Sequence, residues 1–192
     1  MRADQDGIRV RNATVQTGSG DVKLNGTLAV DTSEGGRTRA DAGVELIGTV
    51  VETTRGLISI DGRSLSLDAG VLLVGTEINV GTGQADLLGS RQGAGSSPAL
   101  EVRGTRITAS GNGQITLRGE QRNSSSTGAG IRLAADSVEG STTRNAITSE
   151  SGPIIILGTV NPGRANALAV DITQTDLQTS SGSIKIAGGE GT

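Results

Sequence analysis

The stretch Gly56-Leu57-Ile58-Ser59-Ile60-Asp61-Gly62 sets apolar side chains at alternate positions between two glycines. Such alternation puts Ile58 and Ile60 on one face of a strand, and the glycines suit corners at its ends. Five further stretches share the pattern: GDVKLNG (Gly20–Gly26), GQADLLG (Gly83–Gly89), GQITLRG (Gly113–Gly119), GPIIILG (Gly152–Gly158) and GSIKIAG (Gly182–Gly188). A six-fold repeat of this kind indicates a solenoid, whose units bury their apolar faces against their neighbours.

Two shorter apolar groups lie upstream of each glycine-closed stretch. The first group begins at Ile8, Val44, Val71, Leu100, Ile131 and Leu168, and each is followed two positions later by another aliphatic residue. The second group is Val15, Val51, Ile78, Ile107, Val138 and Leu177. The first aliphatic residue of a repeat and its closing glycine are 18 to 20 positions apart in every repeat except the fifth, where they are 27 positions apart. The longer fifth repeat indicates an insertion near Glu139–Ala146.

The constant core path predicts an all-β fold, a right-handed parallel β-helix of about six coils. Each coil holds three short strands joined by variable loops; in the second coil they are Val44–Leu46, Val50–Thr53 and Leu57–Ile60. The right-handed form is favoured because parallel crossovers are almost always right-handed, whereas no strict six-residue repeat supports a left-handed one. We expect residues 1–192 to form one β-helix domain that is a segment of a longer repeat protein.

The alignment also predicts which side chains stack between coils. An inward aliphatic ladder is expected at Val22, Ile58, Leu87, Leu117, Ile156 and Ile186, and a ladder of small residues at Thr17, Thr53, Val80, Ala109, Ser149 and Thr179. Outward neighbours of opposite charge are expected at Arg9 with Glu45, Glu101 with Arg132, and Glu77 with Arg106. Each such exposed pair stabilises the fold by only about 0.2–1 kcal/mol, so the charges support the register more than the stability.

Composition narrows the function. Phe, Tyr, Trp, Cys and His are absent, and 31 of the 192 residues are Gly, against an average near 7%. The formal net charge is −3 with both signs mixed, which disfavours nucleic acid as a partner. No apolar run approaches the ~20 residues of a membrane helix, so no membrane insertion is expected. Because the chain has no cysteine, its cysteine usage does not indicate a cellular compartment.

The glycine-closed strands, the stretches GRSLSLDAG and GSGDVKLNG, and the Gly/Ser/Thr spacers resemble the repeats of large bacterial exoproteins. The family they look most like is the filamentous-haemagglutinin-like passengers of two-partner secretion, with autotransporter passengers as relatives. That resemblance covers nearly the whole chain, although each motif carries little information. It implies a shaft fragment displayed extracellularly or on the bacterial cell surface, and an outer-membrane transporter as a partner during secretion.

Candidate site residues are few. We predict no catalytic residue, because Asp21, Asp61 and Asp86 fall at different phases of the repeat and do not pair as glycoside hydrolysis requires. We predict no metal, because the chain has no His, no Cys and no glycine-rich calcium repeat, and we predict no cofactor. The Gly-x-Gly stretches at 18–20, 81–83 and 111–113 are interpreted as corners and not as phosphate-binding loops, because a strand rather than a helix is expected after each. The candidate recognition residues lie in the two longest excursions: Glu34, Arg37, Arg39, Asp41, Glu139 and Arg144.

The leading hypothesis is a structural and adhesive shaft segment of a secreted or surface-displayed exoprotein, and not an enzyme. Its loops would contact a host-cell receptor, a glycan or a neighbouring fibre. One alternative is a carbohydrate-active or carbohydrate-binding β-helix domain. The other is a self-assembling extracellular fibre subunit, because open parallel edges at the two ends invite end-to-end association.

Overall fold

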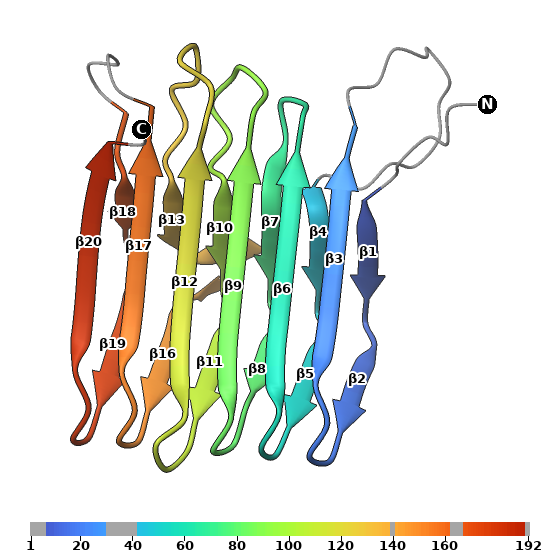
Figure 1. Cartoon of the computed structure of the whole chain (residues 1–192), viewed down its shortest axis with the longest axis vertical. Helices are drawn as coiled ribbons and strands as arrows, with labels where there is room; N and C mark the ends of the chain where they lie inside the picture. Colours follow the sequence, from blue (N-terminus) through green and yellow to red (C-terminus); the bar gives the residue numbers. More distant parts are fainter. Residues whose placement is uncertain (1–6, 30–41, 139–140, 162–166, 191–192) are drawn as a thin grey trace.

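The computed structural model describes residues 7–29, 42–138, 141–161 and 167–190, in which the chain is all-β and forms six coils (Figure 1). Each coil gives one strand to each of three parallel six-stranded sheets, named A, B and C here. In Figure 1 the strands of sheet C run upward in front, those of A and B run downward behind, and successive coils advance from right to left. That sense of winding is right-handed, so the predicted right-handed parallel β-helix is confirmed.

The strands of the three sheets follow one another in the same order in every coil. Sheet A consists of β1 (Ile8–Arg11), β4 (Ala42–Ile47), β7 (Ala69–Val74), β10 (Leu100–Arg103), β13 (Ile131–Ala134) and β18 (Val170–Ile172). Sheet B consists of β2 (Thr14–Thr17), β5 (Val50–Thr53), β8 (Glu77–Asn79), β11 (Arg106–Ala109), β16 (Asn145–Ser149) and β19 (Thr175–Thr179). Sheet C consists of β3 (Val22–Leu28), β6 (Leu57–Ser64), β9 (Gln84–Arg91), β12 (Gln114–Gln121), β17 (Ile154–Val160) and β20 (Ile184–Glu190).

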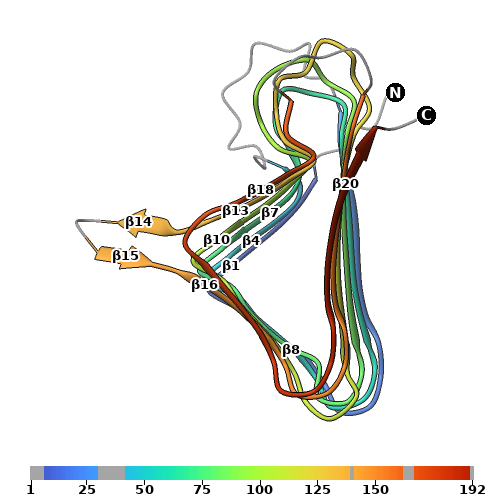
Figure 2. The same ribbon diagram turned by 90° about the vertical axis from the view of Figure 1, so that its left-hand side faces the viewer.

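Seen along its axis, the coil has a nearly triangular cross-section (Figure 2). The hairpin of β14 (Asp136–Val138) and β15 (Ser141–Thr143) projects from the corner between sheets A and B, and its two strands pair antiparallel. The loops that follow β6, β9 and β12 form a separate lobe above the point where sheets C and A meet (Figure 2). No helix that could span a membrane occurs in the described ranges.

Aliphatic side chains fill the inside of the coil, at least five from each of the middle coils. In coil four they include Leu100, Val102, Ile107, Ile115 and Leu117, and these five are 0% exposed. Two come from sheet A, one from sheet B and two from sheet C, because side chains alternate between the two faces of a strand. Stacking therefore produces one continuous dry core, and no coil has a core of its own.

The closing glycines have a steric reason. A Cβ on Gly119 would lie 2.0 Å from the carbonyl oxygen of Gly130 and 2.6 Å from Cγ1 of Ile131. Sheet C here touches the segment that enters sheet A, and only a residue without a side chain allows that approach. Four other closing glycines stand in register with Gly119 and meet the backbone in the same way: Gly26, Gly62, Gly89 and Gly158. We call this row the neck of the coil.

The corner between sheets A and B uses a left-handed residue followed by a buried threonine. Gly48, Gly75 and Gly104 have φ between 53° and 54°, and Asn12 and Gln174 take similar values at the two ends. The following threonine side chains donate hydrogen bonds to backbone carbonyls, as Thr76 Oγ1 does to Leu46 O at 3.0 Å. The Gly-Thr pairs therefore close a corner whose polar groups are satisfied while buried.

Two predicted alignments and one predicted insertion boundary are wrong in the last two coils. In the fifth coil Ile147, not Val138, pairs with Ile107, because the hairpin interrupts the path to β16. Asn145 and Ala146 accordingly belong to β16 and not to the insertion. In the sixth coil Val170 pairs with Ile131, whereas Leu168 is 56% exposed before β18.

The predicted inward ladder mixed two adjacent rows of sheet C. Val22 pairs with Ile58, which pairs with Ala85, while Leu87 belongs to the neighbouring row with Ile60. Both rows point inward because they differ by two residues, so the error left the core assignment intact. The small-residue ladder is confirmed by register, from Thr17 with Thr53 to Ser149 with Thr179. The three outward charge neighbours are confirmed as well.

Candidate functional site

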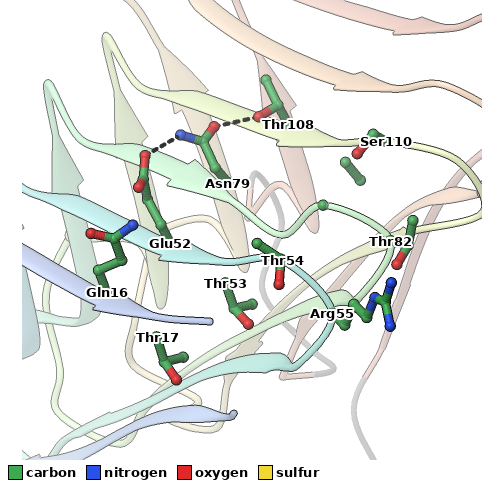
Figure 3. Close-up of a pocket in the computed structure, with 12 residues that line it drawn as sticks. Gln16, Thr17, Glu52, Thr53, Thr54, Arg55, Asn79, Thr82, Thr108 and Ser110 are labelled. Atoms are coloured by element: carbon green, nitrogen blue, oxygen red, sulfur yellow. Dashed lines mark hydrogen bonds between the residues drawn. The ribbon is translucent and has the colours of Figure 1, made fainter. Parts of the chain in front are cut away.

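A polar hollow of about 500 Å³ lies on the outer side of sheet B, where β2, β5, β8 and β11 turn toward sheet C (Figure 3). Its floor is the outward row Gln16, Glu52, Asn79 and Thr108, which the parallel register holds one above another. Its rim is formed by the corner residues Thr54, Arg55, Thr82 and Ser110. The hollow spans the first four coils, so no single coil could form it.

Hydrogen bonds order part of the floor. The Asn79 side-chain nitrogen donates to the carboxylates of Glu52 at 3.0 Å and Glu77 at 3.2 Å, and Thr108 Oγ1 donates to Asn79 Oδ1. The Asn79 amide therefore links three coils and is held in one orientation. Because the row follows the coil axis, its polar groups are spaced by about 4.8 Å, the distance between neighbouring strands.

The chemistry of the hollow suits a ligand rich in hydroxyl groups. Its walls present a carboxylate, two amides and several hydroxyls, so donors and acceptors are both available. Arg55, exposed at the rim, has no hydrogen-bond or ion-pair partner among the described residues. No aromatic ring contributes, since the chain has none. A ligand in this hollow would therefore be held by hydrogen bonds and not by stacking on aromatic rings.

Five of the six predicted recognition residues lie outside the described residues: Glu34, Arg37, Arg39, Asp41 and Glu139.

Arg144 is described and follows the hairpin strand β15. Its guanidinium contacts Asp176 of the next coil, with Nη2 to Oδ1 at 2.7 Å, and both side chains are more than half exposed. The contact joins the base of the hairpin to β19. Arg144 therefore lies near the hairpin base, away from the hollow on the first four coils.

The carboxylates singled out by sequence stay apart. Register places Asp86 beside Ser59 and Asp61 beside Leu88, so Asp61 and Asp86 do not face each other. Asp86 is bound by Arg118 at 2.9 Å. Asp21 lies 3.2 Å from Lys23, and the backbone hydrogen bond from Leu57, with help from Lys23, lowers the pKa of the Asp21 carboxyl.

Among the described residues, two charged side chains, Glu45 and Arg91, are fully buried. Glu45 accepts contacts from Arg9 and Arg11, each at 2.8 Å. Arg91 lies in the loop lobe, where its guanidinium donates to the carbonyls of Ala94 at 2.8 Å and Ser97 at 2.9 Å and to Ser126 Oγ at 2.9 Å. Burial lowers the pKa of Arg91, and the charge of Asp68 opposes that shift. The Glu45 carboxylate and the two terminal nitrogens of Arg91 are bound by partners, whereas Arg91 Nε is buried without a hydrogen bond, and both side chains act as structural anchors.

Within the described ranges, no group of three or more His, Cys, Asp or Glu side chains is placed to hold a metal ion. Sequence reasoning missed the hollow. A signal existed, because the residue after each inward residue of the middle strand is polar throughout: Gln16, Glu52, Asn79, Thr108, Thr148 and Gln178. That row carries no recognised motif, and only the coil register makes it a surface.

Comparisons with protein-family models, with curated proteins and with solved structures found no match.

Proposed function

We propose that this chain is a rigid shaft segment of a secreted or surface-displayed bacterial exoprotein, with a mechanical and adhesive role. One observation carries the proposal: three parallel sheets run uninterrupted through six coils around a single dry core. Backbone hydrogen bonds of all three sheets lie along the coil axis, so the same interactions that hold the coils together resist bending of the rod. The first and last strands stand at opposite ends (Figure 1).

The extracellular location and the partners follow from the resemblance to haemagglutinin-like exoproteins. In this proposal the chain crosses the outer membrane through a transporter while unfolded, and coils form outside as they emerge. A shaft would then hold a distal module away from the cell, while loops or the polar hollow contact a receptor, a glycan or a neighbouring fibre. The proposal includes no catalytic step, because Asp61 and Asp86 are out of register.

Force spectroscopy tests the mechanical part. A molecule tethered at both ends and pulled along the axis is expected to lose one coil at a time. Equivalent residues of consecutive coils are 27 to 39 positions apart, from Val44–Val71 to Ile131–Val170. At about 3.3–3.6 Å per extended residue, each step should lengthen the chain by about 9–14 nm. Smooth extension at low force, without discrete steps, would contradict a load-bearing rod. Surface labelling and protease treatment of intact source cells test the location.

The polar hollow supports a second candidate function, recognition of a neutral glycan. Its row of amide, carboxylate and hydroxyl groups is held in place by the hydrogen bonds of Asn79. Binding of neutral oligosaccharides should be measurable by calorimetry and should weaken in Asn79→Ala. Gln178→Ala is the matched control, because Gln178 belongs to the same outward row two coils beyond the hollow. Equal binding by both variants, or none by the wild type, would refute this role.

A further inference from the structure

The two end coils cover their inward side chains less completely than the middle coils do. In sheet C the inward residues Ile58 and Ile60 are 0% exposed, whereas their counterparts in the last coil, Ile184 and Ile186, are 42% and 50% exposed. At the other end Leu24 and Val15 are only partly buried. Each end therefore presents a cross-section of the core, bordered by one unpaired strand edge of each sheet. Such edges are templates for further strand pairing.

The first and last coils match each other along their whole length. The first runs from Ile8 to Leu28 and the last from Val170 to Glu190, so each spans 21 residues from the start of sheet A to the end of sheet C. The same span of 21 residues joins Val44 to Ser64, the residues that pair with Ile8 and Leu28 within the chain. Neither end coil carries an insertion between its strands.

Particular positions agree as well. Both coils turn from sheet A to sheet B on a residue that is not glycine yet has positive φ: Asn12 at 49° and Gln174 at 46°. Both carry a glycine before and after the inward pair of sheet C, at Gly20 with Gly26 and at Gly182 with Gly188. The backbone of one end is thus shaped like the layer that would follow the other.

We propose that the last coil of one molecule stacks on the first coil of a second copy, extending all three parallel sheets across the junction. Val170, Ile172 and Leu177 would meet the second copy's Ile8, Val10 and Val15, while Ile184 and Ile186 would meet Val22 and Leu24. The contact joins two different surfaces and is translational, so it does not close and generates an open filament. This proposal rests on the coil geometry of residues 8–190 and concerns this chain with both end coils uncovered. It is an alternative to a longer shaft in which further coils of the same protein continue the sheets.

Charge along sheet A agrees with this stacking. Asp171 lies 3.5 Å from Arg132 of the coil below, and a stacked copy would place its Arg9 on the other side of Asp171. Arg9 already contacts Glu45, so the signs would alternate through the junction as Arg132, Asp171, Arg9 and Glu45. One pair opposes the stacking: Lys185 would stand beside Lys23 on the outer side of sheet C. Both lysines are at the surface, where like-charge repulsion is small.

Disulfide trapping tests the register, because the chain contains no cysteine of its own. In the double variant Gln16→Cys with Gln178→Cys, the two thiols of one molecule are separated by five coil steps, about 24 Å, too far for a disulfide. In a stacked pair they occupy neighbouring positions on adjacent strands. Mild oxidation should therefore produce a ladder of multimers on a non-reducing gel.

The matched control moves one thiol by a single coil, as Gln16→Cys with Thr148→Cys. Its thiols would be about 9.6 Å apart across the junction and should give no ladder. Ladders of equal strength from both double variants would indicate random collision and overturn the proposal. Strong dimers from either single variant would show symmetric end contacts and overturn it too.

Sedimentation over a range of concentrations tests the interface itself. Ile186→Lys places a charge in the exposed end of the core and should weaken association about tenfold or more. Lys185→Glu replaces the repulsive pair and should strengthen association about two- to fivefold. Circular dichroism and melting confirm that both variants remain folded. A wild type that stays monomeric at every concentration, or an Ile186→Lys variant that assembles as well as the wild type, would overturn the proposal.

Discussion

Adding a single methyl group at Gly119 should destabilise the coil, although Gly to Ala is the smallest change available. The new Cβ would lie 2.0 Å from the carbonyl oxygen and 2.5 Å from the carbonyl carbon of Gly130, both backbone atoms of a paired segment. Overpacking against a rigid neighbour costs about 1–3 kcal/mol, and backbone contacts belong at the upper end. The unfolded chain loses entropy on the same change, which offsets about 0.4–1 kcal/mol.

The net loss for Gly119→Ala is therefore about 2–3 kcal/mol, which for a chain of this size lowers Tm by about 4–12 °C. The matched control is Gly18→Ala, since an added Cβ there meets nothing within 4 Å and no positive φ is required. In Gly18→Ala the only effect is the reduced entropy of the unfolded chain, which favours the folded state, so this variant should melt at the wild-type temperature or slightly above it. Thermal melts of the two variants and the wild type decide the matter. If Gly119→Ala melted with Gly18→Ala, sheets C and A would not meet at the neck as described.

Three further predictions concern buried and charged groups. Asn145→Ala should lower stability by about 1–3 kcal/mol in urea titrations, because the Thr105 amide hydrogen and the Ala134 carbonyl lose their partner, at 2.9 Å and 2.8 Å; full stability would show that this side chain does not tie the hairpin base to the coil. Arg91→Met should leave the melting of the coil nearly unchanged but speed hydrogen exchange in residues 92–98, whose carbonyls now hold the guanidinium; unchanged exchange would mean that the loop needs no anchor. The depressed pKa of Asp21 contributes stability above its unfolded value of 3.8, and this is lost as the pH falls through the folded pKa; the Asp21 resonance followed by NMR should titrate below 3.8, and Asp21→Asn should remove that part of the acid dependence.

The fold was predictable because its information is local and repeated. Strands with alternating apolar residues such as Ile58 and Ile60 can bury one face only by stacking, and six copies of the same pattern leave one way to stack. Composition agreed with this, since a core without aromatic rings must be thin. One error arose where the repeat is broken, at the hairpin of the fifth coil, where Ile147 and not Val138 continues sheet B. The others, at the entry to the sixth coil and between the two inward rows of sheet C, are shifts of two residues. A two-residue shift preserves the facing of each side chain, so local pattern alone does not reveal it.

The polar hollow could not be predicted in the same way. Gln16, Glu52, Asn79 and Thr108 are separated by about thirty residues each and follow no common motif; they become neighbours only through the register of sheet B. The recognition residues predicted from sequence lie instead in the two longest loops between strands. Of these residues only Arg144 belongs to the described part of the chain, and it forms an ion pair with Asp176. Interpreting a solenoid surface requires knowing which residues align between coils, not which residues cluster in the chain.

By itself the sequence determined the coil, its number of turns and the inward side of most strands, because alternation and glycine spacing are properties of short segments. Strand β16 is the exception, since the hairpin hides its place in the repeat. Only the tertiary structure decided which residues of different segments come into contact. The approach of Gly119 to the Gly130 backbone, the burial of Arg91 among loop carbonyls and the matching of the two end coils all depend on distances between residues far apart in the chain. Such distances are set by the stacking of whole coils, and no single repeat contains them.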